Sequence, residues 1–250
     1  MTPSHKVALS FLAHPDDAEI LCAGTLIRLA RAGWEIHIAT STAGDGGSMT
    51  LGAAEISAIR VAEAQAAARI LGGTYHCLHE LDGRVCYDKP TVQKAIDLFR
   101  VVAPSLVFTH AAKDYMVDHE VVSLLARGAS FVYGAPNVST VPRKPQSGVP
   151  WLYYCDPVGA VDPLGHPVTP TTFVDIAGEI DRKAEALGAH ASQRDWLRSH
   201  HGMDEYIDAM KRHGQERGAL IGTACAEAFV QHRGHPYPQE DLLASLFPGR

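Results

Sequence analysis

Short apolar runs alternate with longer amphipathic runs along the first half of the chain. The β-like runs KVALSFLA and EIHIATST are followed by the helix-like runs AEILCAGTLIRLARAG and AAEISAIRVAEAQAAARILGG, respectively. Two more β-like runs, YHCLHEL and SLVFTH, flank the helix-like run PTVQKAIDLFRVV. Strands that alternate with helices in this way predict a mostly parallel sheet with helices on both faces. We therefore expect a Rossmann-like, doubly wound α/β fold.

The second half of the chain has a different texture. The stretch GAPNVSTVPRKPQSGVP is rich in Pro and Gly and predicts a long surface connection before the strand-like WLYYCD. Residues 174–218 have a helical periodicity that breaks near Gly202, and CAEAFVQHRGHPYP should return to the body of the fold. A chain of 250 residues is within the range of one domain. We predict a single domain, with a core α/β half (1–133) and a loop-rich portion with a helical C-terminal extension (134–250).

The stretch AHPDDAEI places polar side chains directly after the first predicted strand. Ligands of doubly wound sheets bind at the carboxyl ends of the strands. Pro15 favours an extended His14 and is itself favoured at the start of a helix, so the strand should end at His14 and a helix should follow at once. His14 and Asp17 then converge on one point, with Asp16 aimed past them. An imidazole and a carboxylate are zinc ligands, and a catalytic zinc takes three protein ligands.

A second acid–histidine pair follows the predicted strand SLVFTH, within THAAKDYMVDHEVV. Asp118 and His119 open a helix-like run there, in the same setting as His14 and Asp17. His119 is therefore the expected third ligand, and His110 is the alternative. Helix capping is the competing explanation, because acidic residues in a first turn stabilise the positive end of the helix dipole. Two such pairs at strand ends of one sheet favour a metal site over capping.

Composition and charge argue against nucleic acid and membranes as binding partners. The chain is 46% hydrophobic and 20% charged, as in soluble globular proteins, and its formal net charge of −6 gives no electrostatic reason to bind nucleic acid or an anionic membrane. No apolar run approaches the roughly 20 residues that cross a bilayer, so we expect a cytoplasmic protein. The five cysteines are widely spaced and never form a C-x-x-C pair, which disfavours a disulfide framework and a thiolate zinc site.

The stretch AHPDDAEILCAGT resembles the A-H-P-D-D-E signature of the PIG-L or LmbE-like zinc-dependent N-acetylglucosamine deacetylases. GAAEISAIRVAEAQAAARILGG resembles the second helix of that family, VFTHAAKDYMVDHEVV its metal-histidine segment and CAEAFV its C-terminal segment. Members remove acetyl groups from N-acetylglucosamine units, either free or joined to inositol, malate, lipid or another sugar. The resemblance implies a Zn²⁺-dependent N-deacetylase that acts on a small amino-sugar substrate. Because members are often oligomeric, we also expect a homo-oligomer.

By position, the resemblance implies that His14, Asp17 and His119 bind zinc and that Asp16 is the general base. Zinc would lower the pKa of its bound water toward about 7 and polarise the acetamide carbonyl. Asp16 would take a proton from that water and later return it to the departing amine.

The resemblance also implies two substrate contacts. Arg60 would contact a substrate hydroxyl, and Asp82, in ELDGR, would bind the sugar. Each has a simpler explanation: Arg60 could pair with Glu63 on a helix surface, and Asp82 before Gly83 could be an ordinary turn residue.

One position departs from the family pattern. Many relatives carry a second histidine three residues before the metal histidine, where this chain has Met116. That histidine helps to stabilise the oxyanion and pairs with an acid that this chain retains as Asp118, which the resemblance implies is catalytic. Loss of a comparable donor costs about 10² to 10³ in rate. The candidates to replace it are Tyr115, His235, His200 and His201.

Three other functions stay open at this point. The same catalytic residues could cleave a larger N-acyl group from a sugar conjugate. A non-catalytic homologue that binds metal and sugar is kept open by Met116 and disfavoured by the retained Asp16. A nucleotide-dependent oxidoreductase is disfavoured because the loop AGDGGS (43–48) has no G-x-G-x-x-G pattern and the first strand leads into H-P-D-D.

Overall fold

The strands of the chain form one sheet. The computed structural model describes residues 5–139, 141–142, 148–194 and 206–248. Within them, seven strands have the order β3-β2-β1-β4-β5-β7-β6. Strands β1 to β5 run parallel, and β7 runs antiparallel to its neighbours β5 and β6. The bounds are β1 Val7–Leu12, β2 Glu35–Thr42, β3 Gly73–Glu80, β4 Leu106–Thr109, β5 Trp151–Cys155, β6 Thr172–Asp175 and β7 Ala226–Gln231.

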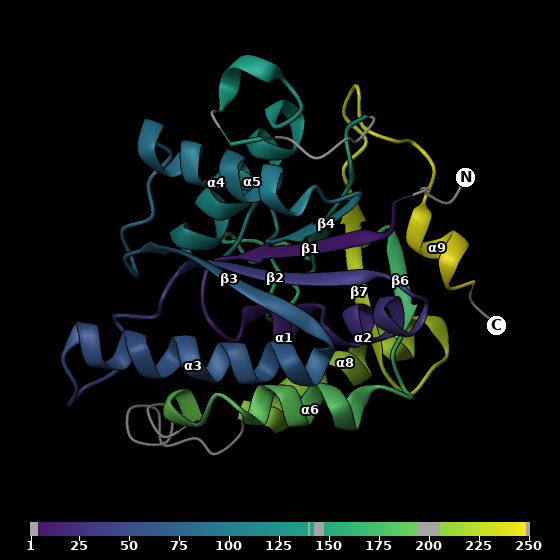
Figure 1. The fold of residues 1–250 in the computed structure, drawn as a ribbon. Coiled ribbons are helices and arrows are strands. Elements are labelled where there is room, and N and C mark those ends of the chain that lie inside the picture. Colours follow the sequence, from purple (N-terminus) through teal and green to yellow (C-terminus); the bar gives the residue numbers. More distant parts are fainter. Residues whose placement is uncertain (1–4, 140, 143–147, 195–205, 249–250) are drawn as a thin grey trace.

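Helices cover both faces of the sheet, as Figure 1 shows. On one face lie α4 (Lys89–Val102) and α5 (Val117–Val132), and on the other lie α1, α2, α3, α6 and α8. Their bounds are α1 Asp17–Leu21, α2 Ala23–Arg31, α3 Ala53–Leu71, α6 Ile180–Gly188 and α8 Tyr206–Ile221; a short α9 spans Leu242–Leu246. The predicted mostly parallel α/β class is therefore confirmed.

Burial on both faces explains why β1 reads as a continuous apolar run. All six of its residues are buried. Leu9 and Phe11 belong to the hydrophobic core under α4 and α5, and Ala8 and Leu12 belong to the core under α2. A strand buried on both faces needs no polar alternation.

The order of the strands determines where a ligand can bind. The chain runs outward from β1 to β2 and β3, then crosses to β4 on the other side of β1. The loops after β1 and β4 therefore diverge from a topological switch point, which is where such sheets bind ligands. His14 follows β1 and His110 follows β4 at this point.

The structure differs from the predicted elements in two places. The helix expected after β1 is split at Cys22, where α1 ends and α2 begins with its own N-terminus. The C-terminal portion also adds two strands to the sheet in addition to its helices, because Thr172–Asp175 pairs with Ala226–Gln231. The helical break predicted near Gly202 lies outside the described residues.

Two sequence expectations about chemistry can be compared with this fold. All five cysteines are free thiols, and Cys22, Cys155 and Cys225 are buried. Among the described helices, none combines the length and the apolar character that a membrane crossing needs.

Candidate metal centre and pocket

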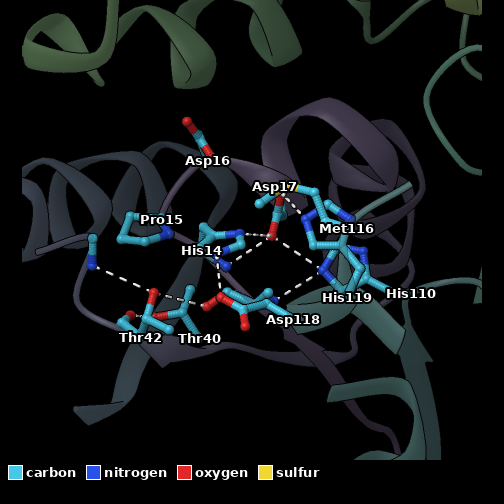
Figure 2. Close-up of polar contacts among 12 residues, drawn as sticks. His14, Pro15, Asp16, Asp17, Thr40, Thr42, His110, Met116, Asp118 and His119 are labelled. Atoms are coloured by element: carbon cyan, nitrogen blue, oxygen red, sulfur yellow. Dashed lines mark hydrogen bonds and ion pairs between the residues drawn. The ribbon is translucent and has the colours of Figure 1, made fainter. Parts of the chain in front are cut away.

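Three side chains from two loops converge at the switch point. His14 follows β1, Asp17 is the first residue of α1, and His119 lies in the first turn of α5. His14 Nδ1 lies 3.4 Å from Asp17 Oδ2, and His119 Nε2 lies 3.7 Å from Asp17 Oδ1. One ligand atom from each residue lies within 4.8 Å of the others, and all three residues are buried (Figure 2). The structure thus brings the three predicted metal ligands together.

His119 is oriented by an acid that the sequence analysis did not single out. Its Nδ1 lies 2.9 Å from Asp114 Oδ1, and Asp114 is itself buried. With Nδ1 held in this way, Nε2 of His119 faces Asp17 and is buried, without a hydrogen-bond partner among the described residues. A carboxylate behind one imidazole nitrogen, with the other nitrogen free, is the arrangement that orients histidine ligands of metals.

His110, the alternative ligand, lies behind this cluster. Its ring stacks on that of His119, with centroids 3.8 Å apart. Its Nε2 lies 2.9 Å from the Ala13 N–H and 3.1 Å from Asp17 Oδ2. His110, Asp114 and His119 form a second group that could hold a metal ion, but His110 does not line the pocket described below.

Asp118 supports His14 from the side opposite Asp17. Its Oδ2 lies 3.2 Å from His14 Nε2 and accepts a hydrogen bond from the Gly83 N–H at 2.6 Å. Its Oδ1 accepts a hydrogen bond from the Val85 N–H. Asp118 is therefore buried behind the His14 ring, where it orients that ring and holds the loop after β3.

The carboxylates favour positive charge at the cluster. Burial alone would raise the pKa of Asp17, but His119 and His110 hold it well below its usual value. Burial alone would lower the pKa of His14, yet its contacts with Asp118 and Asp17 raise it to about 10. The pKa of His119 is raised against burial by Asp17 and Asp114, whereas burial beside His119 lowers that of His110 to about 4.

Asp16 has different partners from those of its neighbour Asp17. Its carboxylate points away from His14 and Asp17, as Figure 2 shows. Its Oδ2 accepts a hydrogen bond from the Tyr206 hydroxyl at 2.6 Å and lies 3.5 Å from Arg60 Nη2. Burial raises the pKa of Asp16, and Arg60 opposes that shift. Its backbone φ of 110° is in the left-handed region, and such outliers concentrate at functional sites.

Arg60 points into the site from α3. Its Nη2 donates to the carbonyl oxygen of Pro15 at 2.8 Å, and its Nη1 lies 3.9 Å from Asp82 Oδ2. The simpler pairing with Glu63 does not occur, because Glu63 accepts hydrogen bonds from Ser192 instead. The glycines of AGDGGS make room for this guanidinium, since a Cβ on Gly44 or Gly47 would lie 2.5 Å from an Arg60 nitrogen.

A pocket of about 340 Å³ opens over the cluster. Its lining residues are His14, Asp16, Asp17, Ile20, Gly46, Gly47, Arg60, Asp82, Gly83, Tyr115, Met116, His119, Gln193 and Tyr206. Asp82 is held at the rim, where its Oδ2 accepts a hydrogen bond from the Gly46 N–H. Of the candidates to replace the missing histidine, Tyr115 lines the pocket and its ring packs edge-on against His119. His235 is not among the lining residues, and His200 and His201 lie outside the described residues.

Tyr206 and Gln193 are pocket residues that the sequence analysis missed. Both come from the C-terminal portion, far from the motifs in sequence. Asp114 was missed although it lies within the quoted histidine segment. Its spacing from His119 was the available signal, because a carboxylate near a ligand histidine is a common supporting partner.

The fold and the pocket define a class of protein: a Rossmann-like α/β protein with a buried His/Asp/His cluster that could hold a metal ion at its switch point. Residues 9–130 match the model of the PIG-L family, described as GlcNAc-PI de-N-acetylase. The match covers just under half of the chain and confirms the resemblance over these residues. Members of this family are hydrolytic deacetylases or related enzymes.

The similar proteins include hydratases as well as a deacetylase. The chain is 27% identical to the 4-oxalmesaconate hydratase of Pseudomonas putida, with 99% of this chain and 92% of that protein covered. It is 26% identical to the 1D-myo-inositol 2-acetamido-2-deoxy-alpha-D-glucopyranoside deacetylase of Rhodococcus opacus, with 76% and 82% covered. The solved 4-carboxy-2-hydroxymuconate hydratase of P. putida KT2440 has a TM-score of 0.78 at 25% identity, covering 95% of this chain and 99% of that chain.

Proposed function

We propose that this protein is a zinc-dependent hydrolase that removes the acetyl group from an N-acetylated amino sugar of the N-acetylglucosamine type, or from a conjugate of one. The observation that carries this proposal is the buried cluster of His14, Asp17 and His119 at the base of a pocket that also contains Asp16. The match to the PIG-L family model and the similarity to a deacetylase support the same chemistry.

The residues of the cluster fit a zinc ion. Two imidazoles and one carboxylate match the donor set of catalytic zinc sites, which keep a further position for water or substrate. The buried Nε2 of His119 has no hydrogen-bond partner in the described part of the chain, and a metal ion would satisfy it. When bound, zinc supplies a Lewis acid that polarises the amide carbonyl and makes water acidic enough to attack near neutral pH.

Asp16 is the proposed general base. It accepts a proton from the attacking water and returns it to the amine that leaves. Burial raises its pKa, which moves it toward the range in which one carboxyl both accepts and donates a proton near neutral pH. In the described conformation its Oδ2 faces Tyr206 and Arg60, so its role requires the carboxylate to turn toward the substrate carbonyl.

Tyr115 is the proposed donor that replaces the histidine lost at Met116. Its ring packs against His119, and it lines the pocket. Burial is the main cause that raises the pKa of its hydroxyl, and the negative charge of Asp17 raises it further. The phenol therefore keeps its proton and can donate it as a hydrogen bond to the oxygen on which negative charge develops.

The charges of the pocket favour a neutral, hydroxyl-rich substrate. Three carboxylates line it: Asp16, Asp17 and Asp82. Arg60 is the one permanent cation among the described lining residues, and it already faces Asp16 and Asp82. Carboxylate oxygens and the guanidinium offer hydrogen bonds to sugar hydroxyls, whereas a polyanion would meet like charges.

A hydratase is the second candidate function, and the coverage of the hydratase relative favours it. That relative matches 99% of this chain, and the names of the hydratases describe unsaturated polycarboxylates. The same base and metal ligands would then serve to add water to a carbon–carbon double bond. We rank the hydratase second because the carboxylates that line the pocket would repel a polycarboxylate substrate.

One experiment separates the two functions. The purified zinc-loaded protein is given N-acetylglucosamine, its disaccharide and an inositol conjugate, and released acetate is measured. In parallel, an unsaturated tricarboxylate is followed by the loss of its ultraviolet absorbance. Acetate release without loss of absorbance supports the proposal, and the reverse result establishes the hydratase. Longer N-acyl sugars tested alongside distinguish a deacetylase from an amidase for larger acyl groups.

A further inference from the structure

Gln193 carries a buried hydrogen-bond acceptor at the wall of the pocket. The residue is 8% exposed and lines the pocket over the metal cluster. Its Oε1 is buried and has no hydrogen-bond partner among the described residues. Buried polar groups in native proteins are almost always hydrogen-bonded, so an unpaired acceptor in a pocket wall points to a bound partner. A ligand that donates a hydrogen bond would supply that partner.

The neighbouring residue Ser192 holds Gln193 in place. The N–H and the hydroxyl of Ser192 donate hydrogen bonds to the two carboxylate oxygens of Glu63, at 2.8 and 2.6 Å. Glu63 lies on α3 three residues after Arg60, so the two side chains are neighbours on that helix. The segment that carries Gln193 is therefore attached to the helix that carries Arg60, although it lies far from that helix in the sequence.

Gly47 leaves open the space beside Gln193 and Arg60. A Cβ on Gly47 would lie 3.1 Å from Gln193 Oε1 and 2.5 Å from Arg60 Nη1. The neighbouring Gly46 donates its N–H to Asp82. The pocket wall around the loop AGDGGS therefore combines an amide, a guanidinium and a carboxylate. All three groups can form hydrogen bonds with the hydroxyls of a sugar.

The chemistry of an amide assigns Gln193 to substrate binding. Among the described residues, it belongs to neither group of side chains that could hold a metal ion. An amide is neutral and does not titrate, so it takes no part in the proton transfers of the proposed reaction. Its contact is therefore with a part of the substrate that does not react.

We propose that Gln193 is a specificity-determining residue whose Oε1 accepts a hydrogen bond from one hydroxyl of the sugar. This inference rests on the proposed deacetylase function and names a contact that selects its substrate. A sugar without that hydroxyl leaves the buried acceptor unpaired in the complex, so the enzyme should discriminate against it.

The test pairs one change in the protein with one change in the substrate. The substrate is the fastest-cleaved of N-acetylglucosamine, its disaccharide and its inositol conjugate, compared with analogues that each lack one hydroxyl. For the unaltered protein, one analogue should lower kcat/KM about tenfold, mainly through KM. Gln193→Met should lose about the same factor on the parent sugar and nothing further on that analogue, because both changes remove the same hydrogen bond.

Two more variants separate this contact from a structural role. Gln193→Glu keeps an acceptor oxygen and should keep the discrimination against that analogue. Gln215→Met is the matched control and should leave the kinetics unchanged, since Gln215 is exposed on α8 and outside the described lining of the pocket.

Two results overturn the inference while acetate release, and with it the proposed function, stands. One is a Gln193→Met variant that retains the full loss on every analogue, as a merely structural residue would. The other is an unaltered protein that cleaves every analogue as well as the parent sugar. Absence of acetate from all three sugars would instead refute the proposed function, and this inference with it.

Discussion

Adjacent carboxylates in the H-P-D-D turn have opposite surroundings. Asp17 is surrounded by imidazoles that lower the pKa of its carboxyl, while Asp16 is buried against Tyr206 and Arg60 and has a raised pKa. Two neighbouring carboxyl groups whose pKa values are pushed apart are suited to different roles. This contrast supports the assignment of Asp17 to charge and metal binding and of Asp16 to proton transfer.

The replacement of the missing histidine is tested by Tyr115→Phe. Removing the hydroxyl should lower kcat by about 10² with a smaller change in KM, because the lost hydrogen bond forms mainly in the transition state. Adding Met116→His to Tyr115→Phe should recover part of kcat. The measurement is steady-state acetate release at saturating zinc. A Tyr115→Phe variant with unchanged kcat would exclude this hydroxyl as the donor.

At the scale of elements, the break between α1 and α2 exposes backbone N–H groups that bind a buried carboxylate. The new N-terminus of α2 lets Gly24 and Thr25 donate their backbone N–H groups to Glu227, at 2.8 and 2.7 Å. Glu227 also accepts a hydrogen bond from Lys183 of α6 at 2.6 Å, and both charged side chains are buried. One carboxylate therefore joins α2, α6 and β7.

Glu227→Gln should destabilise the fold by about 3 to 5 kcal/mol, since it leaves the ammonium of Lys183 buried without a countercharge. Urea unfolding gives this free energy directly. Glu216→Gln at an exposed position of α8 is the control and should change stability by less than about 0.5 kcal/mol. Replacing both partners, as Glu227→Leu with Lys183→Met, should cost less than Glu227→Gln alone; a larger loss would argue against the buried-charge explanation.

The contact between α8 and β5 should make stability depend on pH. Asp156 follows β5, and its Oδ2 lies 2.5 Å from Arg217 Nε. Burial raises the pKa of Asp156 from 3.8 to about 6, and Arg217 opposes that rise. Because this pKa is raised, the folded state binds the proton of Asp156 more tightly than the unfolded state does. Protonation of Asp156 therefore stabilises the fold fully below about pH 3.8, and this contribution is lost as the pH rises through about 6.

Asp156→Asn removes this contribution. The stability of the unaltered protein relative to the variant should fall by about 3 kcal/mol between about pH 4 and pH 7, from a pKa difference of about two units. Thermal or urea unfolding across this range provides the measurement. Asp181→Asn, at an exposed position of α6, should show no such change. A pH-independent difference for Asp156→Asn would refute the shift.

Sequence pattern predicted the parallel strands and the residues that follow them, because β1 and β4 are continuous apolar runs and His14 and His119 lie in distinctive motifs. It could not predict partners supplied across long separations. Tyr206 reaches Asp16 over 190 residues, and nothing in its local sequence marks it. The pattern does not predict β6, whose last two residues fall within the region of helical periodicity, because four residues are too short to show a period of two.

For the whole molecule, zinc should raise the midpoint of thermal unfolding, because an ion that binds the folded state stabilises it by about 2.7 kcal/mol at a concentration of 100 Kd. His119 belongs to both clusters that could hold a metal, so it does not distinguish them. His14→Ala should abolish the zinc-dependent shift, whereas His110→Ala should retain it. The opposite pattern would place the ion in the group of His110, Asp114 and His119.

The central claim is that Asp16 and the cluster of His14, Asp17 and His119 act together to cleave an N-acetyl group. The most direct measurement is acetate release from N-acetylated amino sugars by the zinc-loaded protein and by Asp16→Asn, with bound zinc quantified in both. We predict release by the unaltered protein and a loss of about 10² to 10⁴ in kcat for Asp16→Asn at undiminished zinc content. Equal rates in the two proteins, or no acetate from any substrate in the panel, would contradict the account.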